Sequence, residues 1–114
     1  MNHDRVAEAY DGEFGDEFKE ETRVRCDWIA AKTGSAARVL DIGCSQGIVS
    51  ILVAQAGSSV LGIDNEPSSI DYANLLKQKL DTATQGRVDF VCEDFLNHDF
   101  GSARFDCVIA SEVL

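Results

Sequence analysis

The stretch RVLDIGCSQG, residues 38–47, decides the fold of this chain. Val39, Leu40 and Ile42 have side chains that favour a β-strand, and an acid lies among them. A glycine-punctuated turn follows, and an apolar run begins at Ile48. This pattern predicts a strand, a tight loop and a helix, an arrangement that places free backbone N–H groups beside a polar ligand. We interpret it as a nucleotide-type binding turn.

Strand-like and helix-like segments alternate along the rest of the chain. Further strands are predicted over residues 60–64, 88–92 and 105–110, and helices over residues 48–56 and 67–80. Such alternation implies right-handed βαβ crossovers. The predicted fold class is therefore α/β, with a doubly wound parallel sheet.

We expect a single domain over residues 1–114, with an N-terminal helical segment (1–36) and a sheet region (37–114). Val24, Trp28 and Ala31 recur at helical spacing, and Trp28 is expected in the core. The sequence stops soon after the fourth predicted strand, so we expect a domain truncated there. An open apolar edge on that strand would favour self-association.

Composition narrows the partners and the location. The formal net charge is −10, and no cluster of Lys or Arg forms a stripe, which argues against nucleic acid as a partner. No apolar run approaches the ~20 residues that span a bilayer, so no membrane association is expected. The four cysteines form no CxxC pair and lie near no histidine at ligand spacing, so we predict no metal site. Reduced thiols, packed as small apolar groups at Cys92 and Cys107, favour a cytoplasmic location.

Each predicted strand ends in or beside an acid. Ligands of open parallel sheets bind at these carboxyl ends. Asp64 lies 23 positions after Asp41, one βαβ unit further along, where a carboxylate can accept both hydroxyls of a ribose. Carboxylates at such a rim suit a ligand that offers hydrogen-bond donors or a positive charge, and they repel phosphate.

Glycine spacing argues against two phosphate-binding motifs. If Gly43 were the first glycine of GxGxxG, Ser45 and Ile48 would stand at the second and third glycine positions. The GxxxxGK loop is also absent, because no lysine follows the turn. Both a dinucleotide fingerprint and a phosphate-cradling loop are disfavoured.

The segments VLDIGCSQG, VLGID, VDFVCEDF and FDCVIASEVL together resemble the first four strands of a class I S-adenosylmethionine-dependent methyltransferase. The resemblance covers about residues 16–114. It implies a Rossmann-like sheet in the order 3-2-1-4, S-adenosylmethionine as the cofactor, and transfer of a methyl group to an unidentified small-molecule acceptor. It assigns no catalytic side chain, because the family builds its acceptor pocket mostly from other parts of the chain.

Four cofactor-binding positions implied by the resemblance lie in the first motif. Asp41, Gly43, Ser45 and Gly47 occupy the loop that passes the methionine part of the cofactor. The family usually has glycine where Ser45 stands. Because a Cβ disfavours a positive φ, we expect this loop to sit farther from the ligand and to bind it more weakly.

The remaining implied positions follow the other strands. Asp64 matches the acid that holds the ribose hydroxyls, and Asn65 lies beside the adenine. Asp94 matches the acid that accepts from the adenine amine, with Phe95 packing on the ring. Ser111 stands where the backbone meets the cofactor's amino group. An alternative for Asp94 is a solvated acid in an acidic loop.

Two other functions stay open at this point. A non-catalytic module could keep the fold as a ligand sensor or interaction domain. A nicotinamide-dependent oxidoreductase would share Asp64, but it lacks support from the glycine spacing and from Asp41.

Overall fold

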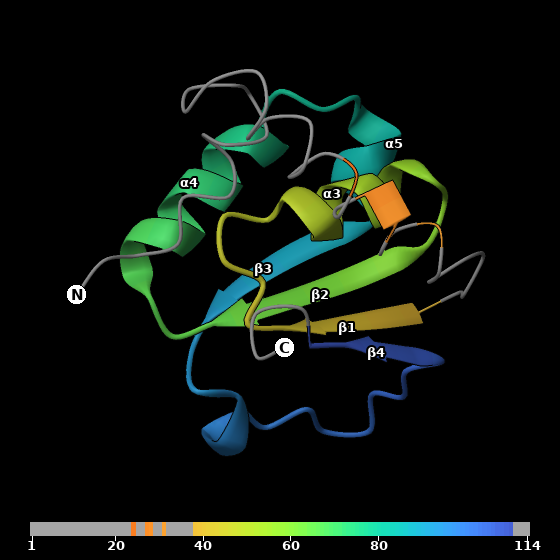
Figure 1. Ribbon diagram of the computed structural model, residues 1–114. Coiled ribbons are helices and arrows are strands. Elements are labelled where there is room, and N and C mark those ends of the chain that lie inside the picture. The colour runs from red at the N-terminus through yellow and green to blue at the C-terminus, as the bar shows by residue number, and fades with distance from the viewer. Residues whose placement is uncertain (1–23, 25–26, 29–30, 32–37, 111–114) are drawn as a thin grey trace.

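The computed structural model describes residues 24, 27, 28, 31 and 38–110. In this part of the chain the strands are β1 (Arg38–Ile42), β2 (Ser59–Asp64), β3 (Val88–Cys92) and β4 (Cys107–Ile109). They form one parallel sheet in the order β3-β2-β1-β4 (Figure 1). The predicted α/β class and strand order are confirmed. The division near residue 36 stays a prediction, because residues 32–37 lie outside the described ones.

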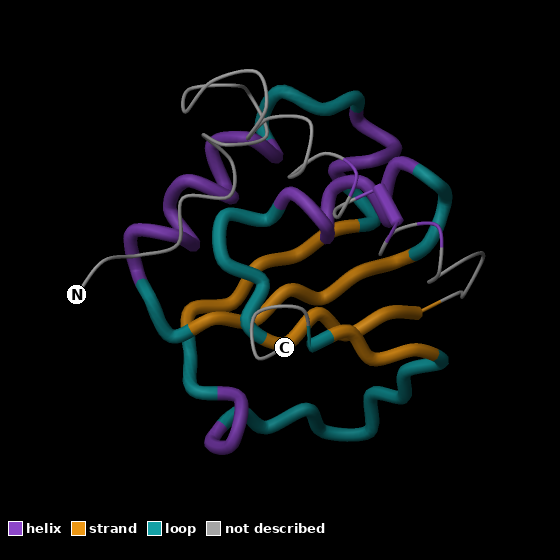
Figure 2. The backbone as a smooth tube through the Cα atoms, in the orientation of Figure 1, coloured by secondary structure: helices purple, strands orange, loops and turns teal. Residues whose placement is uncertain are grey.

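Three α-helices gather on one side of this sheet (Figures 1 and 2). They are α3 (Ile48–Gln55), α4 (Pro67–Lys77) and α5 (Thr82–Gln85). The connection from β3 to β4 contains only a single 3-10 turn, η1 (Phe95–Asn97). Among the described residues, no helix is long and apolar enough to cross a membrane.

A row of valines on neighbouring strands forms the centre of the core. Val39 pairs with Val60, and Val60 pairs with Val88, so the three side chains share one face of the sheet. They pack with Val53 and Ala54 of α3, and all five are at most 4% exposed. The apolar run after the glycine turn is therefore a buried helix, as its composition predicts.

The starts of the later helices follow ordinary capping chemistry. Glu66 caps α4 by accepting hydrogen bonds from the backbone N–H and the hydroxyl of Ser68, at 3.4 and 3.0 Å, and Pro67 takes the first helical position. Asp81 caps α5 by accepting from Thr84. The sequence analysis did not identify α5, because four residues are too few to show a helical period.

Two burial predictions are wrong. The four described residues of the N-terminal segment are helical, but Trp28 is 60% exposed and does not lie in the core. A helical period identifies an apolar stripe without showing what covers it. Cys92 is exposed as well, since it is the last residue of an edge strand.

The fourth strand is shorter than predicted. It covers Cys107–Ile109 rather than residues 105–110. Just before it, the backbone N–H of Asp106 donates to the carbonyl of Arg38 at 2.8 Å, and the N–H of Arg38 donates to the Asp106 carboxylate at 3.1 Å. This reciprocal pair fixes the start of β4 beside the start of β1.

Candidate functional site

A pocket of about 360 Å³ lies at the carboxyl ends of β1, β2 and β3. This is the edge of the sheet where open parallel folds bind ligands. The residues that line it are Ile42, Gly43, Ile63, Asp64, Asn65, Glu93, Asp94, Phe95 and Leu96. Five of the residues singled out from the sequence therefore meet at one site: Gly43, Asp64, Asn65, Asp94 and Phe95.

The glycine loop between β1 and α3 is bonded to the neighbouring strand. The N–H groups of Gly43 and Cys44 both donate to the carbonyl of Ile63, at 2.8 and 3.1 Å. Gly43 and Gly47 have φ values of 69° and 85°, which glycine adopts without steric cost. The loop therefore turns tightly at the pocket wall, and Gly43 presents no Cβ to a ligand.

Ser45 adopts a φ of 55°, a positive value that a Cβ disfavours. The weaker cofactor binding expected from this serine stays a prediction. Its side chain is 3% exposed, and its N–H donates to Oδ2 of Asp64 at 2.9 Å. That hydrogen bond helps to hold the residue in a conformation that ordinarily costs free energy. The Ser45 hydroxyl is buried and has no hydrogen-bond partner among the described residues.

Asp64 is the most constrained acid of the pocket. Its Oδ2 accepts from the Ser45 N–H and its Oδ1 accepts from the Glu66 N–H, each at 2.9 Å. A carboxylate oxygen has two lone pairs, so each oxygen can still accept a further hydrogen bond. The carboxylate is therefore oriented by the backbone and keeps its capacity for a ligand with hydroxyl groups.

Asp41 lies behind the pocket rather than in its lining. It is fully buried, and its Oδ2 accepts from the Ser50 hydroxyl at 2.7 Å. Within the described part of the chain, its Oδ1 has no hydrogen-bond partner. Burial raises the pKa of Asp41 to about 7; the Ser50 hydrogen bond opposes this rise and the nearby charge of Asp64 adds to it. Its hydrogen bond to α3 ties the end of β1 to the helix that follows the loop.

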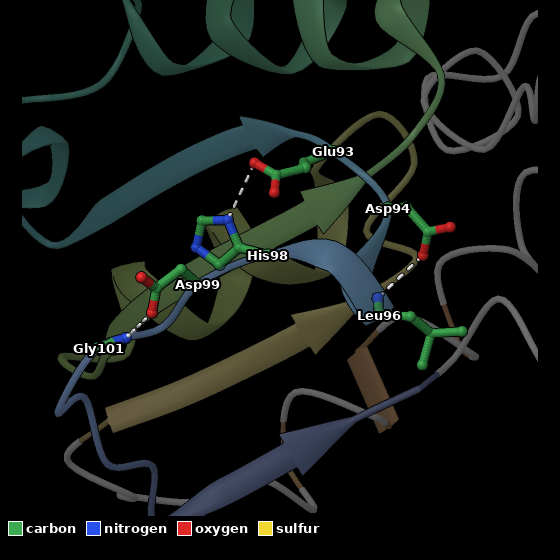
Figure 3. A network of polar contacts seen from close by, with 6 residues as sticks. All are labelled: Glu93, Asp94, Leu96, His98, Asp99 and Gly101. Carbon is green, nitrogen blue, oxygen red and sulfur yellow. Dashed lines mark hydrogen bonds and ion pairs between the residues drawn. The ribbon is translucent and has the colours of Figure 1, made fainter.

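The acids after β3 are held by two different contacts (Figure 3). Asp94 caps η1, because its Oδ1 accepts from the Leu96 N–H at 2.9 Å. Glu93 pairs with His98 over 3.2 Å between Oε2 and Nδ1. Asp94 thus has a structural role and also lines the pocket. Sequence reasoning missed the Glu93–His98 pair, and the only signal for it was their closeness in an acidic loop.

The charge of the lining is of one sign. Asp64, Glu93 and Asp94 are acids, and none of the described residues that line the pocket is Lys or Arg. Such a site favours a ligand with donors or a positive charge and disfavours phosphate groups. Among the described residues, no group of His, Cys, Asp and Glu could hold a metal ion.

The other residues predicted for the site fall into two groups. Asp41, Ser45 and Gly47 lie in the loop or beneath it and do not line the pocket. Ser111 lies outside the described residues. The roles of all these residues toward a ligand stay predictions.

We predict that Asp41→Asn removes a pH-dependent loss of stability. The pKa of Asp41 is about 7 in the folded protein and 3.8 in the unfolded chain, so the folded state holds the proton more tightly. This difference contributes fully to stability below pH 4, and the contribution is lost as the pH rises toward 7. The free energy of unfolding of the parent should therefore fall by up to about 4 kcal/mol relative to the Asn variant across this window. Urea denaturation of both proteins at pH 4.5, 6 and 7.5 measures the difference. A difference that stays constant with pH would contradict the prediction.

The sheet region of this chain is similar to known proteins over almost its whole length. A family model described as a methyltransferase domain matches residues 39–114. The Ubiquinone biosynthesis O-methyltransferase of Xanthomonas campestris pv. campestris (strain B100) is 37% identical over 92 residues, which cover 80% of this chain and 37% of that protein. The Magnesium-protoporphyrin O-methyltransferase of Rhodobacter capsulatus is 32% identical over 80 residues, covering 70% of this chain and 34% of that protein.

Solved structures share the fold. The glycopeptide N-methyltransferase MtfA complexed with sinefungin superimposes with a TM-score of 0.64 at 18% identity, covering 74% of this chain and 34% of that one. The CcbJ methyltransferase from Streptomyces caelestis superimposes with a TM-score of 0.62 at 24% identity, covering 75% of this chain and 35% of that one. This chain thus spans little more than a third of the length of each protein compared. By its family match and its relatives, the chain belongs to the methyltransferase domain family.

Proposed function

We propose that this chain is the cofactor-binding portion of an S-adenosylmethionine-dependent methyltransferase that acts on a small molecule. The observation that carries the proposal is the orientation of Asp64, whose oxygens are aligned by two backbone N–H groups beside the pocket. A carboxylate held in this way suits the paired hydroxyls of a ribose. Family membership supplies the class of reaction.

The residues present fit a nucleoside with a positively charged tail. Asp64 would hold the ribose, and Asn65 and Asp94 lie in the same lining to meet an adenine. Phe95, 37% exposed, offers an apolar surface for the ring. Gly43 leaves room at the loop, and the acidic lining favours a cation over a phosphate. The same charge argues against a nicotinamide dinucleotide.

When bound, S-adenosylmethionine supplies an activated methyl group, which an acceptor attacks in line. The described residues contribute binding and orientation, because a fixed donor position lowers the entropic cost of the reaction. The proposal assigns them no role as a general base.

We further propose that the acceptor atom is an oxygen. The relatives from Xanthomonas campestris and Rhodobacter capsulatus, 37% and 32% identical to this chain, are both named O-methyltransferases. An oxygen atom of a small molecule, in a hydroxyl or a carboxyl group, is the acceptor class that this similarity supports. The cytoplasmic location inferred from the cysteines is likewise proposed, and cell fractionation tests it.

We predict that the chain binds S-adenosylhomocysteine and that Asp64→Ala weakens this binding on the order of 10- to 100-fold, because two charge-assisted hydrogen bonds to the ribose are lost. Isothermal titration calorimetry measures both dissociation constants. Asp71→Ala removes an equal charge from an exposed position on α4 and should bind like the parent. Equal affinity of the Asp64 variant and the parent would sink the assignment of this residue.

Methyl transfer itself separates an enzyme from a ligand-binding module. We expect the full-length protein to transfer the methyl group of radiolabelled S-adenosylmethionine to small molecules that carry hydroxyl or carboxyl groups. Scintillation counting of the extracted product measures it, and Asp64→Ala should lower the rate at limiting cofactor. Tight cofactor binding with no transfer to hydroxyl, amine or carbon acceptors would favour the non-catalytic alternative.

We also propose that the 114-residue chain self-associates through β4. This strand lies at the edge of the described sheet, and Val108 on it is 56% exposed. Analytical ultracentrifugation should show dimers or larger species that Val108→Glu shifts toward monomer. Leu75→Glu, at a similarly exposed position on α4, should leave the distribution unchanged. A parent chain that is monomeric at all concentrations would contradict this proposal.

A further inference from the structure

The ring of Phe90 lies beneath the glycine loop. Phe90 is on β3 and pairs in register with Gly62 of β2. A Cβ placed on Gly62 would lie 2.8 Å from Cδ1 of Phe90, and a Cβ placed on Gly47 would lie 2.7 Å from its Cζ. The ring therefore extends from the middle of β2 to the last residue of the loop.

The Phe90 ring lies closer to Gly62 and Gly47 than it could lie to any residue with a Cβ. The missing Cβ atoms at Gly62 and Gly47 make the space that the ring fills. Cys44 of the loop also reaches this space, since its Sγ would lie 3.0 Å from a Cβ on Gly62. Ala73 of α4 closes the far side, 2.9 Å from the same Cβ position on Gly47. Loop, helix and two strands thus meet at one aromatic ring.

The ring packs against Gly47, at the end of the loop. Gly43 and Cys44 are fixed by the carbonyl of Ile63, at the start of the loop. Gly47, at its end, forms the N-cap of α3 and has its N–H bonded only within the loop, to Cys44 at 3.0 Å. The contact with Phe90 packs Gly47 against β3.

We infer that Phe90 is a positioning residue for the cofactor: its ring sets the height of the glycine loop above the sheet, and through the loop the placement of Ser45 against Asp64. This inference rests on the proposed function. Phe90 does not line the pocket, so its effect on a ligand is indirect. Because the packing is tight, the position of the loop depends strongly on the size of the side chain at residue 90. A smaller side chain leaves a cavity, which either stays empty or is filled by a shift of the loop.

The first experiment compares three substitutions by titration calorimetry with S-adenosylhomocysteine, well below the melting temperature of each variant. Phe90→Leu should weaken binding roughly tenfold, since a small misplacement of binding groups is costly. Phe90→Met, whose unbranched chain can fill the same space, should recover affinity to within about threefold of the parent. Val88→Ala is the control: it removes a fully buried side chain from the same face of β3, away from the loop. Val88→Ala should lower the melting temperature and leave the dissociation constant within about twofold of the parent value.

The second experiment measures the local stability of the glycine loop in the absence of ligand. Amide hydrogen exchange by NMR should be faster at Ser45 and Gly47 in Phe90→Leu, relative to Leu40 and Leu61 in the central strands, which report global unfolding. The two readouts separate the hypotheses. If the parent does not bind S-adenosylhomocysteine, the proposed cofactor is wrong, and exchange alone decides the role of Phe90. Unchanged affinity in Phe90→Leu, or unchanged relative exchange at Ser45 and Gly47, would overturn the inference.

Discussion

Asp64 joins the three chain segments from which the site is built. Its carboxylate accepts from the N–H of Ser45 in the glycine loop and from the N–H of Glu66 at the start of α4. Its backbone carbonyl accepts from the N–H of Glu93 just beyond β3, at 2.9 Å. Loop, helix start and neighbouring strand end are therefore aligned by one residue. A parallel sheet brings these ends together, but only such contacts fix them relative to one another.

Local patterns were enough to predict the parts of the fold that depend on nearest neighbours. The strand Arg38–Ile42, the buried helix after the glycine turn and the helix that begins at Pro67 all follow from short-range sequence signals. Asp64 could be placed at the pocket because its position at the carboxyl end of a strand has a geometric consequence at the sheet edge. The resemblance to a family then supplied the strand order.

Tertiary contacts explain what the sequence did not reveal. Phe90 reads as an ordinary strand residue, and only the sheet register places its ring over Gly62. The positive φ of Ser45 depends on an acid 19 positions away, which no local propensity includes. The burial prediction for Trp28 was wrong for a different reason. Helical spacing of an apolar side chain does not show whether another element packs over it.

The two bonds from Gly43 and Cys44 to a single carbonyl of β2 have a consequence for the course of binding. Because the loop is attached to a central strand of the sheet, it cannot swing aside without breaking contacts in the middle of the fold. An arriving ligand meets a wall that is already in place, and little conformational freedom is lost there on association. Any closure over the ligand must then come from segments other than this loop.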